Sequence, residues 1–153
     1  MKKQWDYKKK IENMTFKELK ERIRDGYDYS MSPIQRVPYI GKSSNKVTYD
    51  YRELVAKCPM TGILDTYRVI IDYIPWKCLP ELKSLKFYFL SYEDLPISHE
   101  HLCSKIYEDF SRTIKPKKLL VRLLTRNRGG IYTTVQLGDL SLATDLRMRS
   151  LDE

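Results

Sequence analysis

The sequence has 153 residues, of which 42% are apolar and 31% are charged, the balance of an ordinary soluble globular domain. No apolar run approaches the ~18 residues that a membrane-spanning helix needs, and the basic N-terminus has no apolar segment behind it, which argues against a signal peptide. Three cysteines without a paired framework fit a reducing compartment, so we expect a cytoplasmic protein with no membrane contact.

The formal net charge is +8, and much of it is concentrated in the first 24 residues, which carry nine Lys or Arg against four acids. A solvated basic arm explains this better than an RNA contact, and no direct contact with nucleic acid is expected. We expect a single domain over residues 1–153. Residues 1–50 are a basic N-terminal helix and an irregular connection, 51–136 are the core that carries the site, and 137–153 are a C-terminal tail.

The first predicted element is a helix. Thr15 and Glu18 have the spacing of a capping box, and Phe16, Leu19 and Ile23 follow as an apolar stripe. Gly26 is expected to end this helix. Residues 27–46 are rich in Tyr, Ser, Pro and Gly and are predicted to be irregular; a subunit contact is a reasonable role for them.

The rest of the chain is predicted as strands around one helix. Strands are expected at 67–74, 84–92, 119–125 and 131–136, with a turn at 126–130, and Ser98 can cap a helix between the second and third. The stripe of that helix is Leu102, Ile106, Phe110 and Ile114. This order predicts an α+β fold, with an antiparallel sheet packed against helices. So short a sheet would have open edges, which oligomerisation can cover.

Cys58 begins the most unusual local stretch, Cys58-Pro59-Met60-Thr61-Gly62. Pro59 and Gly62 favour a tight turn, and a thiol beside the free backbone N–H groups of a turn has a lowered pKa. Asp65 is close enough in sequence to fold back as a proton donor. On this local chemistry alone, a buried structural cysteine is still the favoured interpretation.

Three other stretches carry weaker signals. His99-Glu100-His101 stands at a helix start, where Glu100 is favourable in any case, and a zinc site from His99 and Cys103 lacks further ligands. Glu81 to Lys86 contains two lysines that a strand would send to opposite faces, so a solvated edge explains them as well. Arg126 and Arg128 beside Gly129-Gly130 suit a phosphate, and equally a polar hairpin.

Together, these stretches resemble the QueF-type 7-cyano-7-deazaguanine reductases in order and spacing, over about half the chain. The matching blocks are Cys58-Pro59-Met60-Thr61-Gly62 through Asp65, Glu81-Leu82-Lys83-Ser84-Leu85-Lys86-Phe87-Tyr88, His99-Glu100 and Arg128-Gly129-Gly130-Ile131. The resemblance implies the tunnelling fold, in which strands and helices of several subunits form barrels. It also implies stacked pentameric rings, hence a decamer, with active sites between subunits.

The resemblance implies NADPH-dependent reduction of the nitrile of 7-cyano-7-deazaguanine to 7-aminomethyl-7-deazaguanine, a step of queuosine tRNA modification. Cys58 would form a covalent thioimide with the nitrile, Asp65 would supply a proton, and His99 would lie beside the nitrile and handle protons. The base would be bound by His99, Glu100 and the segment Pro80-Glu81-Leu82. NADPH would be bound by Lys83, Ser84, Lys86, Arg128 and Gly129, and no metal is expected.

Two positions depart from the family pattern. Ser98 replaces a frequent aromatic residue, and Cys103 stands one position beyond a cysteine that pairs with the nucleophile in some relatives, so no such disulfide is expected here. Three alternatives remain open. An amidinotransferase of the same fold would lack the Glu81–Lys86 signature, a pterin-type hydrolase would need zinc, and an inert RNA-binding module would use the basic arm.

Overall fold

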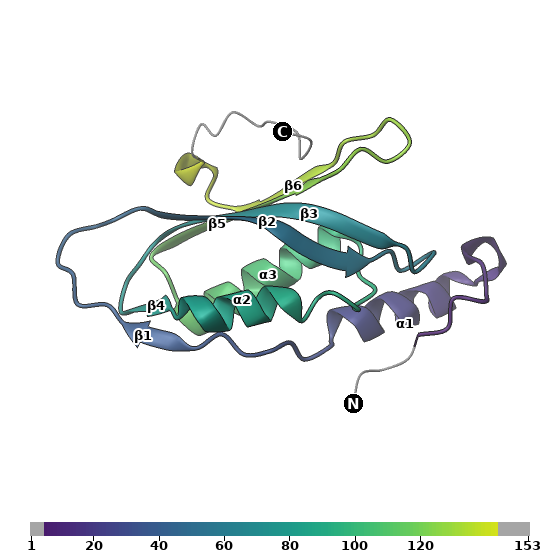
Figure 1. Cartoon of the computed structure of the whole chain (residues 1–153), viewed down its shortest axis with the longest axis horizontal. Helices are drawn as coiled ribbons and strands as arrows, with labels where there is room; N and C mark the ends of the chain where they lie inside the picture. Colours follow the sequence, from purple (N-terminus) through teal and green to yellow (C-terminus); the bar gives the residue numbers. More distant parts are fainter. Residues whose placement is uncertain (1–4, 144–153) are drawn as a thin grey trace.

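The computed structural model describes residues 5–143, which form an antiparallel sheet with helices on one face (Figure 1). The strands of the four-stranded sheet lie in the order β2-β3-β5-β6, and a small second sheet pairs β1 with β4. The strands are β1 (Arg36–Pro38), β2 (Val47–Lys57), β3 (Leu64–Ile74), β4 (Cys78–Pro80), β5 (Lys118–Thr125) and β6 (Thr134–Gly138). The helices are α1 (Phe16–Tyr27), α2 (Leu82–Leu90) and α3 (His99–Ile114), with short 3-10 turns at Ile11–Asn13 and Leu140–Leu142. The predicted α+β class is therefore confirmed.

Helix α1 begins as the sequence predicts but does not end at Gly26. The Thr15 hydroxyl accepts a hydrogen bond from the Glu18 backbone N–H, and the Glu18 carboxylate accepts one from the Thr15 backbone N–H, which completes the capping box. The helix continues to Tyr27. Gly26 is needed for packing instead, because a Cβ there would lie 2.2 Å from the carbonyl oxygen of Pro96.

The predicted strand over 84–92 is wrong, because this segment is the helix α2. Both carboxylate oxygens of Glu81 accept backbone hydrogen bonds at its N-terminus, from Lys83 (2.8 Å) and Ser84 (2.7 Å). The buried positions follow helical spacing: Ser84, Leu85, Tyr88 and Phe89. Phe87, which lies between these buried positions, is 51% exposed.

Strand β2 was not predicted from the sequence, and a β-bulge explains why. Before the bulge Tyr51 faces the helices, where it stacks on Phe89 at 4.6 Å between ring centroids. The register shifts between Tyr51 and Leu54, so Leu54 and Ala56 are then the residues buried in the core. The inserted residue breaks the two-residue alternation by which strands are recognised in a sequence.

Strands β3 and β5 form the centre of the sheet and separate two different environments. Alternate residues of β3, such as Tyr67, Val69 and Ile71, face α3, whose predicted apolar stripe is buried against them. The other face carries ion pairs: Arg68 binds Asp50 on β2 at 2.7 and 2.8 Å, and Arg122 on β5 binds Asp72 at 2.7 Å. None of the helices among residues 5–143 is both long enough and apolar enough to cross a membrane.

Candidate active site

Cys58 lies immediately after β2, in the turn that joins it to β3. The turn is closed by two backbone hydrogen bonds of 2.8 Å, from the Gly62 N–H to the Cys58 carbonyl and from the Cys58 N–H to the Ile63 carbonyl. Gly62 has φ +75°, a conformation that side chains disfavour. The turn predicted at Cys58–Gly62 is therefore present, and Cys58 is 6% exposed.

The environment of the Cys58 thiol favours the thiolate. Burial by itself would raise its pKa, but hydrogen bonds outweigh burial and the pKa lies below the ordinary value. The donors are the Thr61 hydroxyl, the backbone N–H groups of Met60 and Thr61, and the Arg128 side chain. A lowered pKa and a neighbouring cation increase the thiolate fraction, and the thiolate is the nucleophilic form.

Asp65 and Arg128 complete this cluster from two other segments. Asp65 is the second residue of β3 and is buried, whereas Arg128 comes from the β5–β6 hairpin. Arg128 Nη1 lies 3.3 Å from Asp65 Oδ2, and the thiol of Cys58 and the carboxylate of Asp65 both raise the pKa of the guanidinium. The structure therefore brings these two predicted residues to Cys58, with Arg128 bridging the thiol and the carboxylate.

His99 reaches the cluster from the first turn of α3. Its Nδ1 lies 2.9 Å from the hydroxyl of Tyr67, a fully buried residue of β3. Burial and the neighbouring Asp65, which accepts a hydrogen bond from Tyr67, raise the pKa of Tyr67 far above its ordinary value, so the phenol stays protonated. Sequence reasoning missed Tyr67, because nothing distinguishes it from the other apolar and aromatic residues of its strand.

A surface pocket of about 370 Å³ opens beside these residues. Asp65, Tyr67 and His99 contribute to its wall, together with Arg126 and Arg128 of the hairpin. Gly129 (φ +56°) and Gly130 (φ +82°) turn the hairpin. Apart from the chain neighbours of each glycine, no heavy atom of residues 5–143 lies within 4 Å of the place where its Cβ would stand. The wall of the pocket thus combines a carboxylate, an imidazole and two guanidinium groups. Cys58 is not among the residues that line it, but its thiol interacts with Arg128, which is.

Glu81 lies far from Cys58 within one chain. Leu64, at the start of β3, pairs with Lys57 next to Cys58, whereas β4 and Glu81 follow the far end of β3 (Figure 1). The ten residue steps of β3 span roughly 33 Å at about 3.3 Å per residue. One small substrate cannot touch both residues in the same subunit.

The remaining residues of that segment lie on and before α2. The exposed residues of this segment are Leu82, Lys83 and Lys86. Because α2 is a helix, the two lysines at i and i+3 lie on the same side of it. The strand expected from the sequence would have placed them on opposite faces. Lys86 Nζ binds Glu53 at 2.8 Å. Pro80 is buried.

Ser84 is placed as a structural residue in this chain. It is buried, its hydroxyl donates to the Glu81 carbonyl at 2.7 Å, and it accepts the Gln35 N–H at 2.8 Å. Glu100 is exposed in the first turn of α3. Ser98 precedes that helix but does not cap it; its hydroxyl binds His101 Nδ1 at 2.5 Å instead.

The two residues of the alternative zinc site have separate partners. His99 binds Tyr67, whereas the buried Cys103 thiol is directed at the carbonyls of Val121 and Val135, each at 3.7 Å. Among residues 5–143, no group of three or more His, Cys, Asp or Glu side chains is arranged to hold a metal ion.

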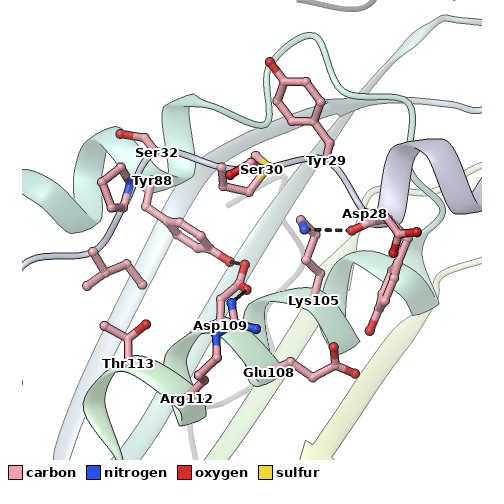
Figure 2. A pocket seen from close by; sticks show the side chains of 14 residues that line it. Asp28, Tyr29, Ser30, Ser32, Tyr88, Lys105, Glu108, Asp109, Arg112 and Thr113 are labelled. Atoms are coloured by element: carbon pink, nitrogen blue, oxygen red, sulfur yellow. Dashed lines mark hydrogen bonds and ion pairs between the residues drawn. The ribbon is translucent and has the colours of Figure 1, made fainter.

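A larger pocket of about 620 Å³ lies elsewhere, between residues 27–34 and α3 (Figure 2). Its polar groups are engaged with one another: Asp109 accepts from Tyr88 at 2.7 Å and from Arg112 at 2.5 Å, and Lys105 Nζ donates to the Tyr27 carbonyl at 2.7 Å. It contains neither a cysteine nor a histidine. We therefore place the candidate active site at Cys58.

Comparison with known proteins gives consistent matches. The model of the family described as QueF-like protein matches residues 65–141. The NADPH-dependent 7-cyano-7-deazaguanine reductase of Thermotoga maritima is 37% identical over 108 residues, which cover 70% of this chain and 78% of that protein. The protein of the same name from Elusimicrobium minutum is 33% identical over 125 residues, covering 82% and 95%.

A solved structure shares the fold. The crystal structure of the archaeosine synthase QueF-Like in the apo form matches with a TM-score of 0.59 and 24% identity, covering 63% of this chain and 95% of that one.

Proposed function

Because this chain belongs to the QueF-like protein family, we propose that it reduces the nitrile of 7-cyano-7-deazaguanine to the aminomethyl group with NADPH. The observation that carries the proposal is the cluster around Cys58. A thiol with a lowered pKa, a buried carboxylate and a histidine come together from separate segments beside one pocket. The relatives named as NADPH-dependent reductases of this nitrile add independent support.

In the proposed reaction, the Cys58 thiolate attacks the nitrile carbon, and the nitrogen takes a proton as the C–S bond forms. Asp65 is the proposed donor, since it is buried in the same cluster. The product is a covalent thioimide on Cys58. His99, held by the protonated Tyr67, is the proposed second group for proton transfer.

Conversion of a nitrile to an amine requires two hydrides and two protons on the C≡N group, besides the temporary bond to sulfur. NADPH, when bound, supplies the hydrides, and two molecules are consumed per base. The imine between the two reductions hydrolyses in water, so a closed site is required.

For the base, the proposed contacts are Glu100, His99 and the segment Pro80-Glu81-Leu82. A carboxylate accepts the paired N–H donors of a guanine-like edge. Glu100 is exposed and near His99 in sequence and structure. Glu81 must exchange its two backbone hydrogen bonds on α2 for the base if it takes part.

The chain has residues that fit the phosphates of NADPH. Lys83 and Lys86 lie exposed on one side of α2, and Arg128 stands beside Gly129 in the open hairpin. These groups would hold the cofactor. Ser84 fits this role poorly, because its hydroxyl already has two partners.

The segment that begins at Glu81 and the cluster around Cys58 are far apart within one chain. This separation suggests that the proposed site is shared between subunits. β2 and β6 are the edge strands of the four-stranded sheet and can pair with neighbouring copies. We propose that residues 1–153 form one domain of the tunnelling fold. In a ring of such domains, stacked as a decamer of two pentamers, the α2 lysines of one subunit would approach Cys58 of the next.

The second candidate is amidinotransfer, in which ammonia adds to the thioimide. The solved archaeosine synthase shares the fold, but at 24% identity that match supports the fold alone and does not favour this activity. The intact Glu81–Lys86 segment and the reductase relatives favour reduction.

A single assay separates the two candidates. Purified protein with 7-cyano-7-deazaguanine should oxidise two NADPH per base consumed, and Cys58→Ala should abolish both the thioimide absorbance and the oxidation. Asp65→Asn should leave base binding largely intact and slow turnover. No NADPH oxidation, with ammonia incorporated into the base instead, would establish the amidinotransferase.

The shared site has its own test. Cys58→Ala and the double variant Lys83→Met/Lys86→Met, each inactive alone, should regain activity when dissociated and reassembled together, since some sites then receive an intact cysteine and intact lysines. Reassembly into mixed oligomers without regained activity would place the site within one subunit.

A further inference from the structure

The segment before α1 packs on the turn that carries Cys58. The Tyr7 ring lies where a side chain of Gly62 would stand: its Cδ2 and Cε2 atoms are both 3.0 Å from an ideal Cβ at that position. Gly62 therefore has a second role besides its backbone conformation, because its missing side chain leaves room for the ring. Tyr7 lies outside the residues 65–141 that match the family model.

Helix α1 supplies the second contact of Tyr7. The guanidinium carbon of Arg22 lies 4.9 Å from the centroid of the Tyr7 ring, within the range of a cation–π interaction. Among residues 5–143, the buried Arg22 Nη2 has no hydrogen-bond partner, and Nη1 makes a weak contact of 3.9 Å with the Met14 sulfur. Since buried guanidinium groups normally have hydrogen-bond partners, the Tyr7 ring is a principal favourable contact of this cation.

The electrostatics place the Tyr7 hydroxyl in the field of the thiol. Burial raises the pKa of Tyr7, Arg22 opposes this shift, and the negative charges of Cys58 and Asp94 add to it. The Tyr7 ring thus contacts the turn, and the negative charge of the Cys58 thiolate raises the pKa of the Tyr7 hydroxyl.

We propose that Tyr7, held by Arg22, is a positioning residue that clamps the Cys58–Gly62 turn and keeps the N–H groups of Met60 and Thr61 directed at the Cys58 sulfur. Two of the donors that favour the thiolate are backbone groups of this turn. Their strength depends on alignment, which weakens steeply when the N–H group turns away from its acceptor. Loss of the clamp releases the turn without removing any group that touches the sulfur.

The proposal rests on the proposed function only in taking Cys58 as the nucleophile. Its test uses iodoacetamide, which alkylates the thiolate without substrate or NADPH. The rate at Cys58 is followed by peptide mass spectrometry against pH, which separates it from Cys78 and Cys103. If the alkylation profiles contradict the clamp, the nitrile-reduction assay still tests the proposed function. If no nitrile reduction is found, the alkylation profiles still test the clamp.

The variants are Tyr7→Leu, Tyr7→Phe and Lys8→Ala. Tyr7→Leu should move the midpoint of the alkylation profile to higher pH, by roughly one unit if alignment of the two N–H groups is lost, with about tenfold slower alkylation below the midpoint. Tyr7→Phe keeps the ring and should retain the wild-type profile. Lys8→Ala removes an exposed neighbouring charge and should do the same.

A purely structural role for Tyr7 predicts a different result. Tyr7→Leu would then lower the melting temperature and leave the alkylation profile unchanged, which overturns the proposal. If Tyr7→Leu does not fold, Arg22→Met decides the question: it removes the cation that holds the ring and should shift the profile in the same direction. An unchanged profile in folded Arg22→Met refutes the clamp.

Discussion

Replacement of Arg128 by methionine should raise the pKa of Cys58. The substitution keeps a long side chain in the hairpin but removes the hydrogen bond to the thiol and the 3.3 Å ion pair with Asp65. The thiolate then loses its cationic neighbour, and the Asp65 carboxylate is left without compensation beside it. Both changes disfavour the negative charge on sulfur.

The size of the effect follows from the exposure of Arg128. A hydrogen bond to a charged group contributes about 1.5–3 kcal/mol when well protected, but the Arg128 side chain is 45% exposed and solvent screens it. The contribution is therefore expected just below this range, at about 1.4 kcal/mol, which corresponds to roughly one pKa unit. Below the midpoint, the thiolate population and the alkylation rate should each fall about tenfold.

The assay is the pH profile of iodoacetamide alkylation at Cys58, with Arg126→Met as matched control. Arg126 is exposed in the same hairpin and lines the same pocket, so its loss removes an equal charge. A wild-type profile for Arg128→Met would refute the reasoning. An equal shift in Arg126→Met would attribute the effect to overall charge rather than to the Arg128 contact.

Three further predictions concern other contacts. Glu81→Ala should lower the melting temperature, because α2 loses the acceptor for two backbone N–H groups. Glu81→Gln should lower it less, because the amide oxygen can still accept one of these hydrogen bonds. Lys86→Met should leave the melting temperature almost unchanged, since its ion pair with Glu53 is exposed, and should raise the KM for NADPH several-fold. Asp50→Asn should destabilise the fold by about 2 kcal/mol at pH 7, less than for a fully buried pair because Asp50 is 26% exposed. Arg68 holds the pKa of Asp50 below its ordinary value; the stabilisation is therefore present above the unfolded pKa of about 3.9 and lost as pH falls through the folded one, so denaturation profiles of the two proteins should converge in acid.

The sequence by itself determined the elements whose signals are local. The capping box of α1, the apolar stripe of α3 and the β-branched run of β3 depend on neighbouring residues, and the structure contains all three. The turn at Cys58–Gly62 is local in the same sense, because Pro59 restricts φ and Gly62 permits the positive φ that the turn requires. The chemical types of the candidate site, a thiol with a following carboxylate and a His-Glu pair, were likewise readable in order along the chain.

Tertiary structure decided what depends on packing. A strand was expected over residues 84–92, but burial of Leu85 and Phe89 together with the Glu81 cap makes this segment a helix. The helix puts Lys83 and Lys86 on one side. The bulge in β2 shifts its buried face at Leu54, a change that only pairing with β3 reveals.

The environment of Cys58 also depends on tertiary structure. Its neighbours in sequence favoured a buried structural cysteine, and Cys58 is indeed buried. The donors of Met60 and Thr61 at the thiol are local, but Arg128 and the Tyr67–His99 pair are distant in sequence. They lie near Cys58 because β3, α3 and the β5–β6 hairpin converge at one end of the sheet. Electrostatic and hydrogen-bond interactions act over a few ångströms in space, and spacing along the chain does not fix such distances.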